Sequence, residues 1–286
     1  MAAGERRTGA GRLRSGSVQV NRRAVLAGLL LAGAGTGVLT AAAPVATAPG
    51  AGIGRLWAEG MTVARGTRSL VAGHHAPAGL LDDLARRADV AGRRVTAVLR
   101  RPVSPVVLVP ASAAEAAVLA GTGSLEGLAA VADGGRVIVV PEFFARLTPT
   151  GRDVVLTHEL THVAAGTGGL PVWLREGFAD YVAYREAGLA VSVAAAELAA
   201  EVRAGRPPER LPGAADFAPG GDGLARAYQA AWLACRFLAA RCGEETLVRL
   251  YREARTGGVE RALASLGLSI GTLTERWRSY VRDQLA

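Results

Sequence analysis

Two short valine-rich runs, each followed by a proline, constrain the fold of this chain most strongly. They are Val106–Val109, which precedes Pro110, and Val137–Val140, which precedes Pro141. Continuous apolar runs of this length are typical of strands that are buried on both faces. Proline lacks a backbone donor, so each run is predicted to end as a strand there. A further strand or hairpin is predicted within Met61–Val71.

After Pro141, apolar residues recur at the three- and four-residue intervals of helices. Thr150 and Asp153 predict a capping box at the start of the first helix, and Arg206–Gly223, rich in Pro, Gly and Asp, is expected to be a lid or the rim of a cleft. Strands followed by helices indicate an α+β fold, with a small mixed sheet and a mainly helical C-terminal half. The predicted helices are Pro77–Leu99, Ala113–Ala120, Leu125–Ala130, Gly151–Ala165, Val172–Ala187, Val191–Ala204, Leu224–Arg241, Glu244–Thr256 and a last segment ending at Leu285.

The first 51 residues are predicted to direct the chain out of the cytoplasm. Met1–Arg23 holds six arginines and one acidic residue, and so carries five of the eight net positive charges. The uncharged stretch Ala24–Ala43 and the tripeptide Ala46–Ala48 follow, in the order of an export signal. The pair Arg22–Arg23 resembles a twin-arginine signal. Because about 20 apolar residues can also cross a bilayer, a cleaved signal and a plasma-membrane anchor both stay open.

Residues 52–286 are expected to form one extracytoplasmic domain. Half of the chain is hydrophobic, which is enough for one sizeable core. This part has no basic run with interleaved aromatic residues, so nucleic acid is not an expected partner. Cys235 and Cys242 lie seven residues apart in a predicted helix, or about 10.5 Å. Because that separation is too long for a disulfide unless the helix ends between them, they are expected to be buried thiols.

Two of the four histidines, His158 and His162, stand four residues apart, with Glu159 beside the first. On a helix these imidazoles share one face, whereas Leu156 and Leu160 point to the other side. H-E-x-x-H on a helix is a pattern in which two histidines bind one zinc ion and the glutamate acts as a base. The alternative is a surface helix with two solvated histidines. The apolar surroundings argue against it, since unpaired polar groups would be costly there.

A catalytic zinc takes three protein ligands and keeps one position open. No histidine follows His162, but the next predicted helix carries Glu176 and Asp180 on one face. Glu176 is expected to be the third ligand, and Asp180 to accept a hydrogen bond from the outer nitrogen of a ligand histidine. Gly177 is expected to let this helix approach the first closely. Alternatively, Glu176 forms a salt bridge with Arg175 or is a surface charge.

H-E-x-x-H followed by W-L-x-E-G-x-A-x-Y resembles the gluzincin metallopeptidases, the thermolysin-like clan, and especially its short bacterial members of the peptidase MA-like family. The resemblance extends from Val106 to the C-terminus and is most specific over Val154–Tyr184. It implies a zincin-like fold with an edge strand beside the H-E-x-x-H helix. It also implies a Zn²⁺ ion held by His158, His162 and Glu176, with Glu159 as the catalytic base.

The resemblance further implies how a substrate would bind. The edge strand, along which a peptide would lie by β-augmentation, is expected to be the segment that comprises Arg136, Val137, Ile138, Val139 and Val140. Tyr228 is the candidate oxyanion donor, against the alternative of a packed aromatic residue. His74 and His75 are expected to belong to a turn. Acidic clusters that would bind calcium are absent from the sequence, so calcium is not implied.

These observations predict an exported zinc metallopeptidase that hydrolyses peptide bonds with a metal-activated water. Its expected partners are a peptide or protein substrate and, if the N-terminal segment is uncleaved, the membrane. Two alternatives stay open. One is a non-proteolytic binding module of the cell envelope with a structural zinc. The other is a zinc amidase that acts on non-peptide amides such as cell-wall crosslinks.

Overall fold

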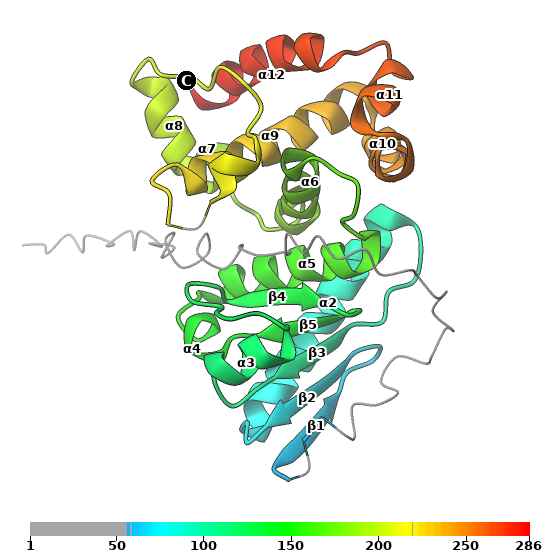
Figure 1. Cartoon of the computed structure of the whole chain (residues 1–286), viewed down its shortest axis with the longest axis vertical. Helices are drawn as coiled ribbons and strands as arrows, with labels where there is room; N and C mark the ends of the chain where they lie inside the picture. The colour runs from blue at the N-terminus through cyan, green and yellow to red at the C-terminus, as the bar shows by residue number, and fades with distance from the viewer. Residues whose placement is uncertain (1–55, 58, 219) are drawn as a thin grey trace, which may run out of the picture.

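A computed structural model describes residues 56–286 except 58 and 219 (Figure 1). The predicted export signal, or membrane anchor, at residues 1–51 lies outside the described residues. Within the described part, none of the helices combines the length and apolar character that a membrane span requires.

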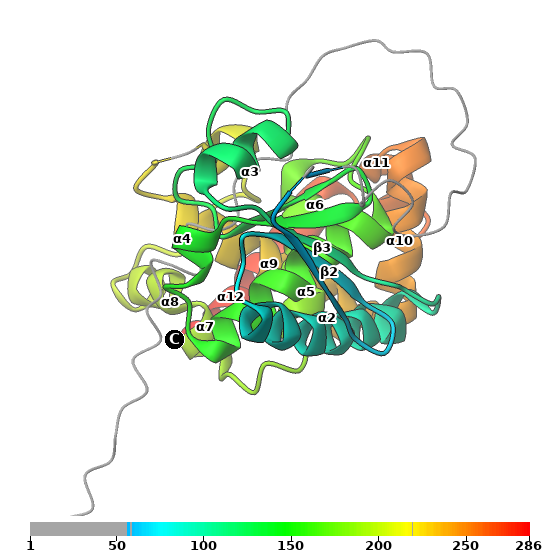
Figure 2. The same cartoon turned by 90° about the horizontal axis from the view of Figure 1, so that it is seen from below.

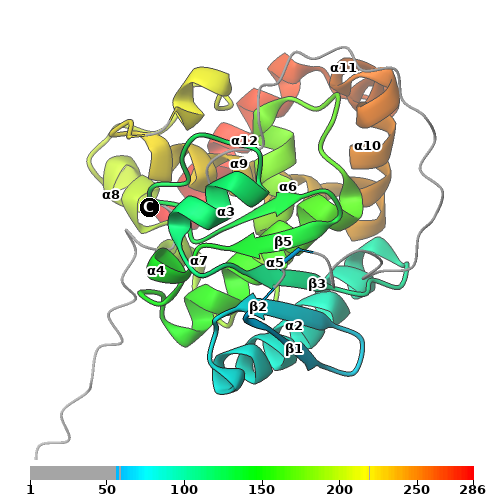
Figure 3. The same cartoon turned by 60° about the horizontal axis from the view of Figure 1, so that its bottom comes forward.

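In the described residues, five strands form one mixed sheet in the order β1–β2–β3–β5–β4 (Figure 3). β1 and β2 are antiparallel and form a hairpin that begins in the predicted segment Met61–Val71 and continues beyond it to His74, whereas β2, β3 and β5 run parallel. The two valine-rich runs are the adjacent strands β3 and β5, in a register that places Val107 opposite Val137. The strand bounds are β1 (Met61–Arg65), β2 (Leu70–His74), β3 (Val106–Val109), β4 (Ala130–Asp133) and β5 (Arg136–Val139).

Side chains of the sheet alternate between two apolar layers. Val107 and Val137 pack with buried residues of α2 (Ala78–Leu99) and α5 (Pro149–Ala165) on one face. Leu108 and Ile138 pack on the other face, which α3 (Ala113–Leu119) covers (Figure 2). Burial on both faces explains why these strands are continuously apolar rather than alternating. The fold is mixed α+β, as predicted.

The C-terminal half is helical, and α5 lies between it and the sheet (Figure 1). One continuous cluster of buried apolar side chains extends from Leu84 on α2 through Leu160 on α5 to Trp277 near the C-terminus. The sheet and the helical half therefore share a core. The remaining helices are α4 (Pro141–Phe144), α6 (Val172–Tyr184), α7 (Val191–Ala194), α8 (Ala196–Arg203), η2 (Ala214–Phe217), α9 (Leu224–Cys242), α10 (Glu244–Gly257), α11 (Val259–Ala264) and α12 (Ile270–Leu285).

The prediction that residues 136–140 form an edge strand was wrong. β5 is an interior strand, paired with β3 on one side and with β4 on the other. Its Val137, Ile138 and Val139, and Val140 directly after it, are buried, so a peptide cannot pair with this segment. Among the described strands, the free edge on that side belongs to β4, which is antiparallel to β5 and packs against α5. β4 was missed because its first residue, Ala130, closes the segment Leu125–Ala130, which was wrongly predicted to be a helix.

Two further local predictions were wrong. The N-cap of α5 is Thr148, whose hydroxyl accepts a hydrogen bond from the backbone N–H of Gly151 at 3.1 Å. Proline at the first helical position follows it. Asp153, expected in a capping box with Thr150, instead pairs with Arg87 on α2 at 2.6 Å. The predicted helix of residues 191–204 is broken into α7 and α8 at residue 195.

Gly177 brings a different pair of helices together than expected. A Cβ atom added there would lie 2.2 Å from the backbone oxygen of Ala231 on α9. Glycine therefore allows α6 to approach α9, and the contact with α5 does not depend on it. The packing of α6 on α9 still positions the site, because it sets where α6 presents Glu176 to α5.

Candidate metal centre

Helix α5 provides two imidazoles and a carboxylate in a buried setting. His158, Glu159 and His162 are each at most 7% exposed. The Nε2 atoms of His158 and His162 lie 2.9 Å apart, and the two rings are nearly perpendicular. The polar face of α5 is therefore covered by other elements instead of facing solvent, and two solvated histidines on a surface helix are excluded.

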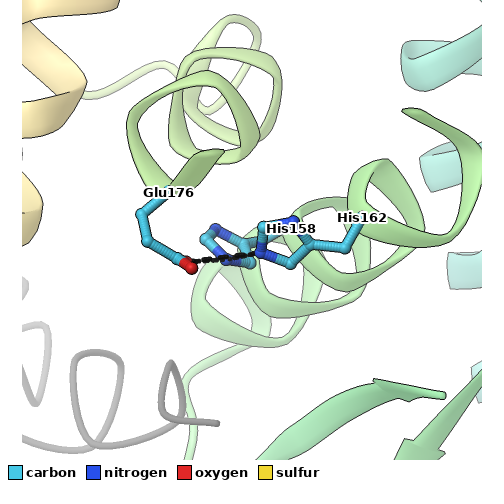
Figure 4. A group of neighbouring side chains, drawn as sticks. All are labelled: His158, His162 and Glu176. Carbon is cyan, nitrogen blue, oxygen red and sulfur yellow. Dashed lines mark hydrogen bonds and ion pairs between the residues drawn. The ribbon is translucent and has the colours of Figure 1, made fainter. Parts of the chain in front are cut away.

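Helix α6 brings Glu176 to this pair (Figure 4). Its Oε2 atom lies 3.3 Å from Nε2 of His158 and 3.3 Å from Nε2 of His162. Ligands at about 2.0–2.1 Å from a tetrahedral zinc ion are separated by about 3.3–3.4 Å, which is close to both distances, whereas the two Nε2 atoms, 2.9 Å apart, are closer than this spacing. His158, His162 and Glu176 thus form a buried group that could hold a metal ion. Two imidazoles and one carboxylate are a ligand set found in catalytic zinc sites.

Asp180 lies one turn after Glu176 on α6 and reaches the outer nitrogen of His158. Its Oδ1 atom is 2.9 Å from Nδ1 of His158, and the carboxylate is 2% exposed. This hydrogen bond holds the proton of a neutral imidazole on Nδ1 and leaves Nε2 free to bind a metal. Nδ1 of His162, by contrast, is buried without a hydrogen-bond partner among the described residues.

The ionisable groups of the site strongly shift one another's pKa values. Burial raises the pKa of Glu159 to about 8, an effect that Glu176 increases and that His158 and a backbone hydrogen bond from Ala132 oppose. Burial alone would lower the pKa of His158, but Asp180 and then Glu176 raise it to about 10. Burial alone would raise the pKa of Glu176, but the two histidines hold it well below its usual range. Without a metal, His158 is therefore the group that holds positive charge.

The carboxylate of Glu176 is shared between the imidazoles and Arg175. Nε of Arg175 donates to Oε1 of Glu176 at 2.7 Å, while Oε2 faces the histidines. The salt bridge with Arg175 and the role of metal ligand were predicted as alternatives for Glu176. They are compatible, because each uses a different oxygen of the carboxylate. No signal in the sequence indicated this division.

Tyr228 reaches the site from α9. Its ring centroid lies 6.5 Å from that of His158 in an edge-on arrangement, and the side chain packs against Phe217 at 5.0 Å on η2. Burial raises the pKa of Tyr228 well above its usual value, and the carboxylates of Glu176 and Asp180 add to this effect. The phenol therefore keeps its proton at neutral pH and can donate a hydrogen bond. The structure brings Tyr228 to the site and also packs it as an aromatic residue.

The other predicted features lie apart from this group. His75 adopts φ +52° in a turn, as expected. His74, which was expected in the same turn, is instead the last residue of β2 and pairs through Nδ1 with Glu115 at 2.7 Å. Cys235 and Cys242 are free thiols, the first buried and the second half-buried. The loop 206–223 forms a rim as expected, because with α8 and α9 it lines an open cavity of about 560 Å³.

Comparison with known proteins adds no family assignment. No protein-family model matches the sequence, and no curated protein matches it. The functional conclusion therefore rests on the residues and geometry of the site.

Proposed function

We propose that this chain is an exported zinc metallopeptidase of the gluzincin type, which hydrolyses peptide bonds. One observation carries the proposal: His158, His162 and Glu176 converge from two helices on a common point, with Glu159 next to the first histidine. The zincin-like architecture and the gluzincin family are part of the proposal. Export rests on the N-terminal sequence alone.

Zinc is the metal we propose, because two imidazoles with one carboxylate are a common ligand set for catalytic zinc. When bound by three protein ligands, zinc acts as a Lewis acid and lowers the pKa of a water in its open position to about 7. The residues that would hold it are His158, His162 and Glu176. Asp180 would keep the ring of His158 oriented and in the tautomer that binds metal.

Glu159 is the group on this chain that would move protons. It would accept a proton from the attacking water and then pass that proton to the leaving amine. In the metal-free site, burial raises the pKa of Glu159 toward neutrality, and a group whose pKa lies near the working pH can both accept and return a proton. Tyr228, which stays protonated, would donate a hydrogen bond to the oxygen that becomes negatively charged at the carbonyl under attack.

The free edge of β4 is the proposed place for the substrate. An extended peptide can add to an exposed sheet edge by main-chain hydrogen bonds. β4 packs against α5, the helix that carries Glu159. A peptide on this edge would therefore pass beside the catalytic base. We therefore propose β4, in place of Arg136–Val140, as the strand along which the substrate lies.

The experiment uses the purified full chain, the Glu159→Gln variant and the control Glu260→Gln, which changes an exposed glutamate on α11. Metal content and digestion of a peptide library are measured for each. We expect about one zinc per chain in all three proteins, because three ligands suffice. Hydrolysis should be lost only in Glu159→Gln. Undiminished hydrolysis in that variant would refute the mechanism.

The same experiment separates the alternatives. A cell-envelope module with a structural zinc would bind zinc, would cleave nothing and would unfold when a chelator removes the ion. A zinc amidase would leave the peptide library intact but would cleave non-peptide amide substrates, again only with Glu159 present. The buried carboxylate of Glu159 beside the ligands favours hydrolysis, since a structural site has no use for a base.

A further inference from the structure

Arg175 makes an unusual contact for a residue next to its partner in a helix. Neighbouring residues on a helix point about 100° apart and do not face each other. Nε of Arg175 nevertheless lies 2.7 Å from Oε1 of Glu176. The guanidinium side chain is 19% exposed and the carboxylate 5%. Arg175 must therefore fold back along α6 toward the interior, which costs side-chain entropy and separates it from a freely solvated surface charge.

Arg175 is the cation that the structure places against the carboxylates of the site. The carboxyl groups of Glu159, Glu176 and Asp180 are each at most 5% exposed. In the part of the chain that the structure describes, Arg175 is the only lysine or arginine in an ion pair with any of them. A buried carboxylate needs a partner of opposite charge, and Arg175 is such a partner for Glu176.

The two oxygens of Glu176 have different partners. Oε2 lies at equal distances from the two Nε2 atoms, whereas Oε1 is held by Arg175. A carboxylate with both oxygens free can bind a metal through both. A guanidinium on one oxygen uses one of its lone pairs and draws its negative charge away from the metal, which makes the other oxygen the preferred ligand. One oxygen from Glu176 and two imidazole nitrogens make three protein ligands and leave the fourth position open, as a catalytic zinc site requires.

We propose that Arg175 is a positioning residue, which restricts Glu176 to one metal-binding oxygen. This inference rests on the metal site of the proposed function. Arg175 touches neither the substrate nor the metal and acts through Glu176. Its removal therefore changes how the chain binds zinc, and this effect can be measured without any substrate.

The experiment compares three variants of the full chain. Arg175→Met removes the charge and the donor but keeps an unbranched stem, and Arg175→Lys keeps the charge without the fixed guanidinium geometry. Arg185→Gln is the matched control, because Arg185 lies just after α6 and pairs with Glu244 at 2.8 Å, away from the metal ligands. The zinc dissociation constant is measured by competition with a chelator. The number of zinc-bound oxygen and nitrogen atoms is measured by X-ray absorption.

We expect Arg175→Met to shift the zinc dissociation constant by about 10-fold or more toward tighter binding, because a positive charge near the ion is lost and Oε1 of Glu176 becomes free to bind it. The number of zinc-bound atoms should rise by one as Oε1 of Glu176 joins the ion. Arg175→Lys should fall between this variant and the wild type, and Arg185→Gln should match the wild type. Wild-type affinity and coordination in a folded Arg175→Met variant would overturn the inference. If Arg175→Met does not fold, wild-type affinity and coordination in Arg175→Lys would overturn it.

Failure of this inference can be told from failure of the proposed function. If the wild type binds zinc and cleaves peptides but the Arg175 variants bind zinc equally well, only the inference fails. If the wild type binds zinc without hydrolysing any amide, the proposed reaction fails, and the affinities still decide the role of Arg175. A wild type that binds no zinc would refute both.

Discussion

The carboxylate of Asp180 lies 2.9 Å from Nδ1 of His158, on the opposite side of the ring from the nitrogen that faces Glu176. Both acidic residues come from α6, one turn apart. A single helix therefore provides a metal-binding oxygen and the group that orients a metal-binding ring. Because α6 is held by its close packing on α9, the geometry of the site depends on the helical half as much as on α5.

Replacing Asp180 tests this relationship. Asp180→Ala removes the acceptor that holds the tautomer of His158, so zinc affinity should fall by about 10- to 100-fold. The measurement is competition with a chelator on the folded chain. Asp283→Ala, at an exposed position on α12, is the control and should bind zinc as the wild type does. Equal affinity in Asp180→Ala would show that the hydrogen bond does not contribute to metal binding.

Tyr228→Phe tests the proposed oxyanion donor. Phenylalanine keeps the packing against Phe217 but lacks the hydroxyl. Hydrolysis should slow by about 100-fold or more, as when a donor to a developing oxyanion is lost. Zinc affinity should not change. Tyr280→Phe is the control for kcat. It also removes a tyrosine hydroxyl, one that accepts a hydrogen bond from Arg236 in the helical half. An unchanged kcat in Tyr228→Phe would reduce this residue to a packing role.

Gly177→Ala tests the approach of α6 to α9. The added methyl group would lie 2.2 Å from the backbone oxygen of Ala231, so one helix must move. The free energy of unfolding should fall by about 1–3 kcal/mol, as for other overpacked cores. Gly79→Ala on α2 is the matched control, because no atom lies within 4 Å of an added Cβ there. That change should raise the free energy of unfolding by about 0.5–1 kcal/mol. Urea unfolding measures both, and equal effects would contradict the close approach.

Asp89 on α2 accepts three backbone hydrogen bonds from the loop that joins β1 and β2. The donors are the N–H groups of Thr67, Arg68 and Ser69, at 2.6, 3.0 and 3.0 Å. Asp89→Ala should lower the free energy of unfolding at neutral pH by about 1–2 kcal/mol, at the low end for bonds to a charged group because the carboxylate is half-buried. Asp82→Ala, at an exposed position on the same helix, should have almost no effect in the same urea titration.

The contribution of Asp89 should also depend on pH. Partial burial raises its pKa, but the hydrogen bonds from Arg68 and Thr67 outweigh burial and hold the pKa below the ordinary 3.8. An acidic group whose pKa is lower in the folded than in the unfolded state contributes its full stabilisation of the fold at pH values above the unfolded pKa. This stabilisation is lost as the pH falls from about 3.8 through the folded pKa. Wild type and Asp89→Ala should therefore converge in stability as the pH falls below 3.8, and a constant difference there would contradict the assignment.

Some of the fold could be predicted because it depends on neighbours in sequence. The strands β3 and β5 followed from valine-rich runs ended by proline, and α5 and α6 from apolar spacing. Their bounds were wrong mainly at the ends, where one capping residue competes with another, as Thr148 does with Thr150. The prediction of a helix over residues 125–130 failed for a different reason. A short apolar run without clear periodicity fits a helix or a strand equally well.

The sequence by itself determined which residues could form a metal site, because helical spacing places His158 beside His162, and Glu176 one turn before Asp180. Only the tertiary structure decided how they meet. The order of strands made β4 the free edge, since pairing between distant segments is not encoded in local periodicity. The close packing of α6 on α9 is why residue 177 is a glycine. The Arg175 side chain folds back onto Oε1 of Glu176, so that only Oε2 faces the histidines. These contacts depend on where whole elements lie in space, which spacing along one helix does not specify.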